Sequence, residues 1–134
     1  MEKMKAQVIV YARHQNKKHL LLLQTSGERN HIWQNVTGSV DAGESFFDGA
    51  KRELFEETGI VATPIETQIE YKFFDRWQKN VIEKVFYVNL ENTPQVRLSE
   101  EHANFKWIPI EEIQQEHFHY SSNYEAFCLT KDLP

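Results

Sequence analysis

Cysteine is nearly absent from this sequence of 134 residues, because Cys128 is its only one. A single cysteine excludes an internal disulfide framework and a cysteine-based zinc site, and we expect its side chain to be buried as a small hydrophobe. The longest purely aliphatic run, Leu20–Leu23, is far too short to span a membrane. Residues 1–7 carry charge but no apolar secretion signal, so the sequence predicts a cytoplasmic protein.

Positive charge is also scarce, since 15 Lys and Arg stand against 20 Asp and Glu, for a formal net charge of −5. This balance disfavours binding to long nucleic acid, which needs a basic face to displace counterions. An acidic protein that handles phosphate groups needs a cation to mediate the contact. The five Gly and four Pro are dispersed and mark no linker, so we expect one domain over residues 1–134.

Short apolar segments alternate with helical patterns along the chain. Apolar, aromatic and β-branched residues predict strands at 7–12, 20–24, 34–40, 65–75, 81–90 and 105–108. Strands interleaved with helices in this order indicate a layered α/β domain.

The clearest helical pattern covers residues 46–58. Ser45 is expected to cap its first turn, and Gly59 is expected to end it in the left-handed conformation. A capping box of Ser122 and Glu125 predicts the start of another helix near the C-terminus. The two shorter helices are expected at 110–115 and 123–129.

The helix at 46–58 has two distinct faces at 100° per residue. One stripe suits burial against a sheet and consists of Phe47, Ala50, Leu54 and Thr58. The other gathers three carboxylates, Glu53, Glu56 and Glu57, whose repulsion Arg52 offsets by pairing with Glu56. Two interpretations are open: a solvated acidic face, or a site for a hard cation such as Mg²⁺, which prefers oxygen ligands.

The spacing around this helix favours the cation site. Residues 38–60 follow the pattern G-x5-E-x7-R-E-U-x-E-E-x-G-U, where U is a bulky aliphatic residue, and every specified position matches. A chance match at typical residue usage has odds on the order of one in 10⁸ per start position. The segment resembles the Nudix box, and the chain is therefore similar to the Nudix hydrolases.

This resemblance implies the Nudix fold, an α/β/α sandwich with a mixed β-sheet. It also implies a hydrolase acting on phosphoric anhydrides, with Mg²⁺ as cofactor and Mn²⁺ as a substitute. The ion would be held by the box glutamates Glu53, Glu56 and Glu57. The carbonyl of Gly38 would add a ligand, Arg52 would orient the glutamates, and Glu44 would support the loop before the helix. Metal ions bridging phosphate oxygens would shield the attacking water from negative charge.

Three further segments are similar to one branch of the family. Residues 36–39 read Val-Thr-Gly-Ser, where many Nudix proteins have Pro followed by Gly-Gly or Gln-Gly. With Glu-His-Ala-Asn-Phe-Lys-Trp at 101–107 and Ser-Asn-Tyr-Glu-Ala at 122–126, this resembles the bacterial dihydroneopterin triphosphate pyrophosphatases, also known as dATP pyrophosphohydrolases. In that branch a glutamate outside the box acts near the metals, as ligand or as base. It corresponds to Glu101, with Glu100 as the competing choice and a plain loop carboxylate as the alternative.

Candidate substrate contacts lie before the box and in the C-terminal segment. Trp33 would stack on a pterin or purine ring, although core packing is its plainer interpretation, as it is for Phe74, Trp77 and Trp107. Gln34 would hydrogen-bond a base edge, and Arg29 would meet phosphates. Asn123 is expected either to face the substrate or to cap a helix.

The sequence therefore predicts a Mg²⁺-dependent pyrophosphohydrolase of a nucleoside or pterin triphosphate, such as dihydroneopterin triphosphate or dATP. Its products would be the monophosphate and pyrophosphate. The alternatives are an RNA 5′-triphosphate pyrophosphohydrolase and a non-catalytic nucleotide-binding module. The expected partner is a small molecule, not a membrane or long nucleic acid, and a homodimer is compatible with the resemblance.

Overall fold

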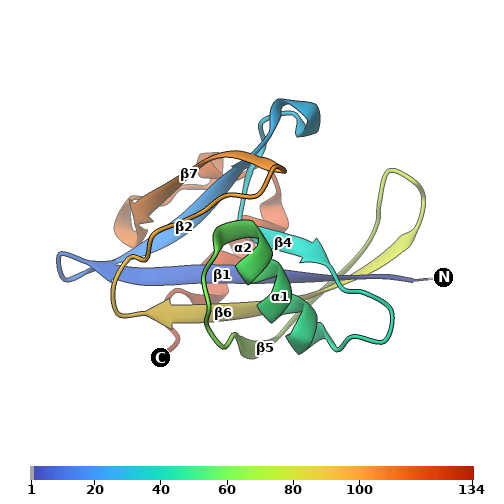
Figure 1. Ribbon diagram of the computed structural model, residues 1–134, viewed down its shortest axis with the longest axis horizontal. Coiled ribbons are helices and arrows are strands. Elements are labelled where there is room, and N and C mark those ends of the chain that lie inside the picture. The colour runs from blue at the N-terminus through green and yellow to red at the C-terminus, as the bar shows by residue number, and fades with distance from the viewer. Residues whose placement is uncertain (1) are drawn as a thin grey trace.

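The computed structural model describes residues 2–134, in which a seven-stranded sheet lies between two helices (Figure 1). The strands are β1 (Lys3–His14), β2 (Lys17–Thr25), β3 (Trp33–Gln34), β4 (Val36–Ser39), β5 (Ile65–Phe74), β6 (Asn80–Leu90) and β7 (His102–Pro109). Their order is β3-β2-β1-β6-β5, while β4 pairs with β1 and β7 pairs with β2. The helices are α1 (Phe46–Thr58) and α2 (Ser121–Thr130), with 3₁₀ turns at Gly27–Arg29, Ile110–Glu112 and Gln115–His117.

β1 lies in the middle of the sheet because its side chains alternate between two apolar cores. Val8 and Val10 point into one core, and Ile9 and Tyr11 into the other, all at most 1% exposed. Burial on both faces is typical of a central strand. β1 runs parallel to β6 and antiparallel to β2 and β4, so the predicted mixed sheet is confirmed.

α1 forms the layer on one face of the sheet. Its first turn is capped by Ser45, whose hydroxyl accepts a hydrogen bond from the backbone nitrogen of Asp48 at 3.0 Å. Gly59 ends it with φ of 77°, in the left-handed region that glycine tolerates best. Ala50 and Leu54 are fully buried in the core under the helix. The predicted boundaries and both caps are therefore confirmed.

α2 covers the opposite face of the sheet. Its Ala126 and Phe127 pack in the same core as Ile9 and Tyr11. The Tyr11 hydroxyl lies 2.7 Å from Oγ1 of Thr130, which anchors the end of the helix to β1. Two helical layers around one sheet confirm the predicted α/β/α sandwich. Neither helix of residues 2–134 has the length and hydropathy needed to cross a membrane.

Two local predictions near the C-terminus are wrong. The helix expected at 110–115 is replaced by two 3₁₀ turns, because Ile113 adopts an extended conformation between them. The capping box of Ser122 and Glu125 is absent, since the cap position is Tyr120 and no side chain caps α2. The Glu125 carboxylate instead accepts a hydrogen bond from the Tyr71 hydroxyl at 2.9 Å.

Cys128 is exposed, so the expectation that it is buried is also wrong. The reason is the helical period of α2. Its buried positions are Asn123, Ala126, Phe127 and Thr130. These positions follow the spacing of a single buried stripe, which turns Cys128 toward solvent.

Candidate active site

Arg52 projects from α1 toward the loop that precedes the helix. Its Nε and Nη2 donate to the two carboxylate oxygens of Glu44 at 2.8 and 2.9 Å, and Nη2 also donates to the Ser39 carbonyl at 2.9 Å. The paired hydrogen bonds from Arg52 lower the pKa of Glu44 to about 2. This bidentate pair fixes the direction of the guanidinium and joins the loop to the helix.

The remaining nitrogen of that guanidinium aligns two carboxylates of α1. Arg52 Nη1 donates to Glu53 Oε1 and to Glu56 Oε2, each at 3.0 Å. The Glu53 side chain is only 13% exposed, whereas that of Glu56 is 53% exposed. Glu53 therefore lies inside the acidic face and Glu56 at its rim.

Glu57 is the buried member of the acidic face. The residue is 3% exposed, and its Oε2 has no hydrogen-bond partner. Burial raises the pKa of its carboxyl well above the ordinary range, the neighbouring Glu53 and Glu101 raise it further, and Arg29 lowers it. A buried carboxylate with a bare oxygen is costly unless a cation or donor compensates it.

His102, at the start of β7, faces the same bare oxygen. Its Nε2 lies 4.0 Å from Oε2 of Glu57, which is too far for a hydrogen bond. Like that oxygen, Nε2 of His102 has no hydrogen-bond partner. Its Nδ1 lies 3.5 Å from Oγ of Ser99. Two unpaired buried atoms so close together indicate that a group the protein does not supply completes the arrangement.

At Gly38, β4 passes so close to the Glu53 side chain of α1 that a side chain on residue 38 would have to displace it. A Cβ atom at this position would overlap the carboxylate of Glu53. Gly38 is held in place by its pairing with Ala6 of β1. The backbone of Gly38 therefore lies directly against the acidic face.

Glu101 extends the acidic face from the turn before β7. Its charge contributes to the raised pKa values of Glu53 and Glu57, after the larger contribution of burial. Its Oε1 also accepts a hydrogen bond from Nη2 of Arg29 at 3.0 Å. Glu100 is exposed in the same turn. The tertiary structure thus brings Glu101 beside the carboxylates of α1.

These donors fit a hard divalent cation, because carboxylate oxygens are its preferred ligands and Glu57 offers a bare one. Among residues 2–134, however, no group of three His, Cys, Asp or Glu side chains already converges as a finished metal site. Glu53 and Glu56 instead converge on Nη1 of Arg52, at 3.0 Å each. A cation would compete with Arg52 for their oxygens.

Two expected substrate contacts, Trp33 and Gln34, form the short strand β3. Both are half-buried, and Gln34 is paired with Leu23 of β2. The ammonium of Lys106 lies over the Trp33 ring, 4.1 Å from the ring centroid. One face of the indole is therefore already in contact with a cation.

The other two expected contacts differ in exposure. The Arg29 side chain is 58% exposed and reaches Glu101, so it lies at the rim of the acidic face. Asn123 is only 3% exposed, and its Oδ1 accepts a hydrogen bond from the backbone nitrogen of Asn35 at 2.8 Å. The Asn123 amide oxygen thus joins α2 to the segment between β3 and β4.

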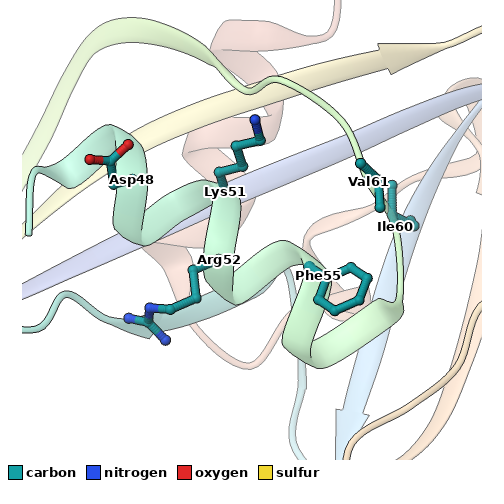
Figure 2. A pocket seen from close by; sticks show the side chains of 6 residues that line it. All are labelled: Asp48, Lys51, Arg52, Phe55, Ile60 and Val61. Carbon is teal, nitrogen blue, oxygen red and sulfur yellow. The ribbon is translucent and has the colours of Figure 1, made fainter.

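An open groove of about 290 Å³ runs along another side of α1 (Figure 2). Its lining residues are Asp48, Lys51, Arg52, Phe55, Ile60 and Val61. The guanidinium of Arg52 points away from the Lys51 and Phe55 side chains in this view. The three box glutamates do not line the groove, which meets the acidic face at Arg52.

A family model and two known enzymes show which family the chain belongs to. The family model described as the NUDIX domain matches residues 3–129. The chain belongs to the Nudix family. It is 34% identical over 110 residues to the asymmetrical bis(5′-nucleosyl)-tetraphosphatase of Caenorhabditis elegans, covering 80% of this chain and 79% of that protein. It is 35% identical over 115 residues to the dihydroneopterin triphosphate diphosphatase of Escherichia coli strain K12, covering 75% and 74%.

A solved structure supports the same assignment. The E. coli dihydroneopterin triphosphate pyrophosphohydrolase superposes with a TM-score of 0.78 at 27% identity, covering 95% of this chain and 93% of that one. The chain is thus a Nudix hydrolase acting on phosphoric anhydrides, in a family that generally uses divalent metal ions and small-molecule substrates. The predicted family and enzyme class are confirmed.

Sequence reasoning did not single out His102 as a site residue. The signal was its place in segment 101–107, directly after Glu101. Its contact with Glu57 joins the end of α1 to the start of β7. A contact between such distant segments depends on the sheet order and has no local sequence pattern.

Proposed function

We propose that this Nudix hydrolase uses Mg²⁺ to cleave a pterin or purine nucleoside triphosphate into the monophosphate and pyrophosphate. The observation that carries the proposal is Glu57, a buried carboxylate with a bare oxygen beside two further carboxylates. A cation that the substrate phosphates help to hold would neutralise such a group.

The residues of the acidic face would have different roles in holding the metal ion and activating water. The ion would be held by Glu53, Glu56, Glu57, Glu101 and the carbonyl of Gly38. When bound, the ion would lower the pKa of the attacking water and shield the negative charge of the phosphates. Arg52 would keep the glutamates of α1 aligned, and Glu101 would either hold the ion or take the proton from the water.

The substrate would be held from the side of β3 and Arg29. Arg29 is exposed next to Glu101, so it would meet phosphate oxygens. Trp33 would present the free part of its ring to the substrate ring, with Gln34 beside it. Asn123 would act on the substrate through Asn35, whose backbone nitrogen it binds.

A second candidate is hydrolysis of a dinucleoside tetraphosphate, which the C. elegans relative favours by its name and its 34% identity. The E. coli relative has 35% identity, so overall similarity does not separate the two. The segments at 36–39, 101–107 and 122–126 favour the triphosphate, because the sequence resemblance to dihydroneopterin triphosphate pyrophosphatases rests on them.

A substrate panel with product identification tests these candidates. The purified chain is incubated with Mg²⁺ and dihydroneopterin triphosphate, dATP, a dinucleoside tetraphosphate or 5′-triphosphate RNA, and the products are separated by anion exchange. Pyrophosphate with a monophosphate from either of the first two substrates is the expected result. Release of phosphate alone, or preference for the dinucleotide or the RNA, would contradict it. Absence of turnover on every substrate would favour a binding module.

The homodimer and the cytoplasmic location expected from the sequence stay predictions. Light scattering of the purified chain and fractionation of the source cells would test them.

A further inference from the structure

Glu83 is a second buried carboxylate, outside the acidic face. It lies on β6, is 4% exposed, and its Oε1 accepts a hydrogen bond from Nε2 of Gln7 at 2.9 Å. Among residues 2–134, none of the ion pairs includes it. Burial raises the pKa of its carboxyl above the ordinary value, whereas the hydrogen bond from Gln7 and the charge of Lys5 lower it. A buried carboxylate that forms no ion pair is costly to keep in the folded protein.

The amide of Gln7 is oriented by its other contact. Its Oε1 accepts a hydrogen bond from Nδ2 of Asn35 at 2.8 Å, and the same Nδ2 approaches the carbonyl of Asn123 at 3.3 Å. Gln7 must therefore present its amino group to Glu83. Only Oε1 of Glu83 is used in this way, so the buried polar chain ends in a carboxylate that still has acceptor capacity.

This carboxylate lies on the sheet face that α2 partly covers. Side chains alternate along β1, so Lys5 and Gln7 share a face with Ile9 and Tyr11, which pack against α2. Lys5 is paired with Glu83 of β6 and with Ser39 of β4. Figure 1 shows the first part of β1 and the β5–β6 hairpin reaching beyond α2. Glu83 is thus at the part of this face nearest the segment that begins the box.

One strand separates Glu83 from the acidic face. Lys5 of β1 is paired with Glu83 of β6 on one side and with Ser39 of β4 on the other, and the neighbouring Gly38 lies against the Glu53 carboxylate. Burial and the charge of Lys3 lower the pKa of half-buried Lys5, whereas Glu83 raises it. A ligand with phosphates at the acidic face and hydrogen-bond donors at its other end matches this arrangement.

We propose that Glu83 recognises the ring of the substrate by accepting hydrogen bonds from a ring N–H and an adjacent amino group. This inference rests on the proposed function and narrows its substrate class. Pterin and guanine rings carry such a pair of neighbouring donors on their amino-oxo edge. Adenine instead places an acceptor nitrogen beside its amino group, which would face the carboxylate unfavourably. Glu83 is then a specificity residue that selects an amino-oxo ring over adenine.

The test is the variant Glu83→Gln, which keeps an oxygen for Gln7 but replaces the other acceptor with a donor. Its matched control is Glu70→Gln, which changes an exposed carboxylate of β5. Both are assayed with dihydroneopterin triphosphate, GTP, dATP and a diadenosine tetraphosphate, and each variant is melted to confirm folding. For Glu83→Gln we expect kcat/KM to fall about 10- to 100-fold with the preferred amino-oxo substrate, through KM. The values for adenine substrates should stay within about twofold or rise.

The two amino-oxo substrates separate a pterin from a guanine, since the one with the larger loss carries the recognised ring. Equal losses on all four substrates, or no loss on any, would overturn the inference while leaving the proposed hydrolysis intact. A wild-type preference for adenine substrates would also overturn it. If no substrate is turned over, the proposed function fails. The inference is then decided by NMR titration with GMP and AMP, in which only the wild type should favour GMP.

Discussion

Glu57 and Glu83 are both buried carboxylates, yet their surroundings are opposite. Glu57 stands among other carboxylates with a bare oxygen, whereas Glu83 is attached to a chain of neutral amides. The protein leaves the first charge for an outside cation to balance. It stabilises the second by the Gln7 amide and by the charge of Lys5, and the acceptor capacity that is left suits recognition of N–H groups. Burial alone therefore does not assign a role to a carboxylate, because its neighbours determine which group completes its interactions.

Removing the charge of Glu57 is expected to have the largest effect. We expect Glu57→Gln to lower kcat by about 10³-fold, because it removes the charge that a cation would neutralise. Folding should be unimpaired, since a buried charge is lost. Steady-state kinetics, Mn²⁺ binding by electron paramagnetic resonance and thermal denaturation measure these effects. Glu66→Gln, an exposed change on β5, is the control. Unchanged turnover in Glu57→Gln would falsify the assignment of the acidic face.

Arg52 tests whether the acidic face depends on one oriented guanidinium. Arg52→Lys keeps the charge but loses the bidentate bond to Glu44, so we expect metal affinity and activity to fall about 10- to 100-fold. Lys51→Arg, on the neighbouring position of the same helix, should change neither. Isothermal titration with Mg²⁺ gives the affinities. Equal behaviour of the two variants would show that Arg52 contributes only charge.

His102 tests whether the bare oxygen of Glu57 needs a nearby donor. His102→Asn shortens the side chain, so we expect metal affinity to fall about 10-fold. His102→Gln, whose amide nitrogen extends as far as Nε2, should restore part of it. His14→Asn, at the exposed end of β1, is the control, and Mn²⁺ titration is the measurement. A purely structural role would lower the melting temperature of both His102 variants and leave their metal affinities alike.

The smallest expected effect concerns the stability of Glu83. Its pKa is raised in the folded state by burial, so the folded protein holds this proton more tightly than the unfolded chain. The stabilisation is complete below the unfolded pKa and is lost as pH rises through the folded one. The free energy of unfolding of Glu83→Gln, relative to wild type, should therefore increase between pH 4 and pH 8. Urea denaturation at several pH values measures it, and a flat difference would contradict a raised pKa.

Local patterns predicted α1 and its caps because each depends on neighbours a few residues away. Ser45 needs only the backbone of Asp48, and Gly59 needs only a positive φ. The same reasoning failed at α2. Ser122 and Glu125 have the spacing of a capping box, but the helix begins earlier, at Ser121, with Tyr120 at the cap position. Local reasoning also left His102 out of the candidate site, because only the order of the strands in the sheet brings it near Glu57.

Spacing within one segment was enough to predict the family, the acidic face of α1 and the burial of Ala50, Leu54 and Thr58, although Phe47 of the same stripe is exposed. Which carboxylates are buried, and what faces them, depends on the tertiary structure. Glu83 has no local signal, and its burial arises because β1 runs parallel to β6 and brings Gln7 within hydrogen-bonding distance. Strand pairing across distant segments sets each carboxylate's solvation and partners, and these in turn determine its chemistry.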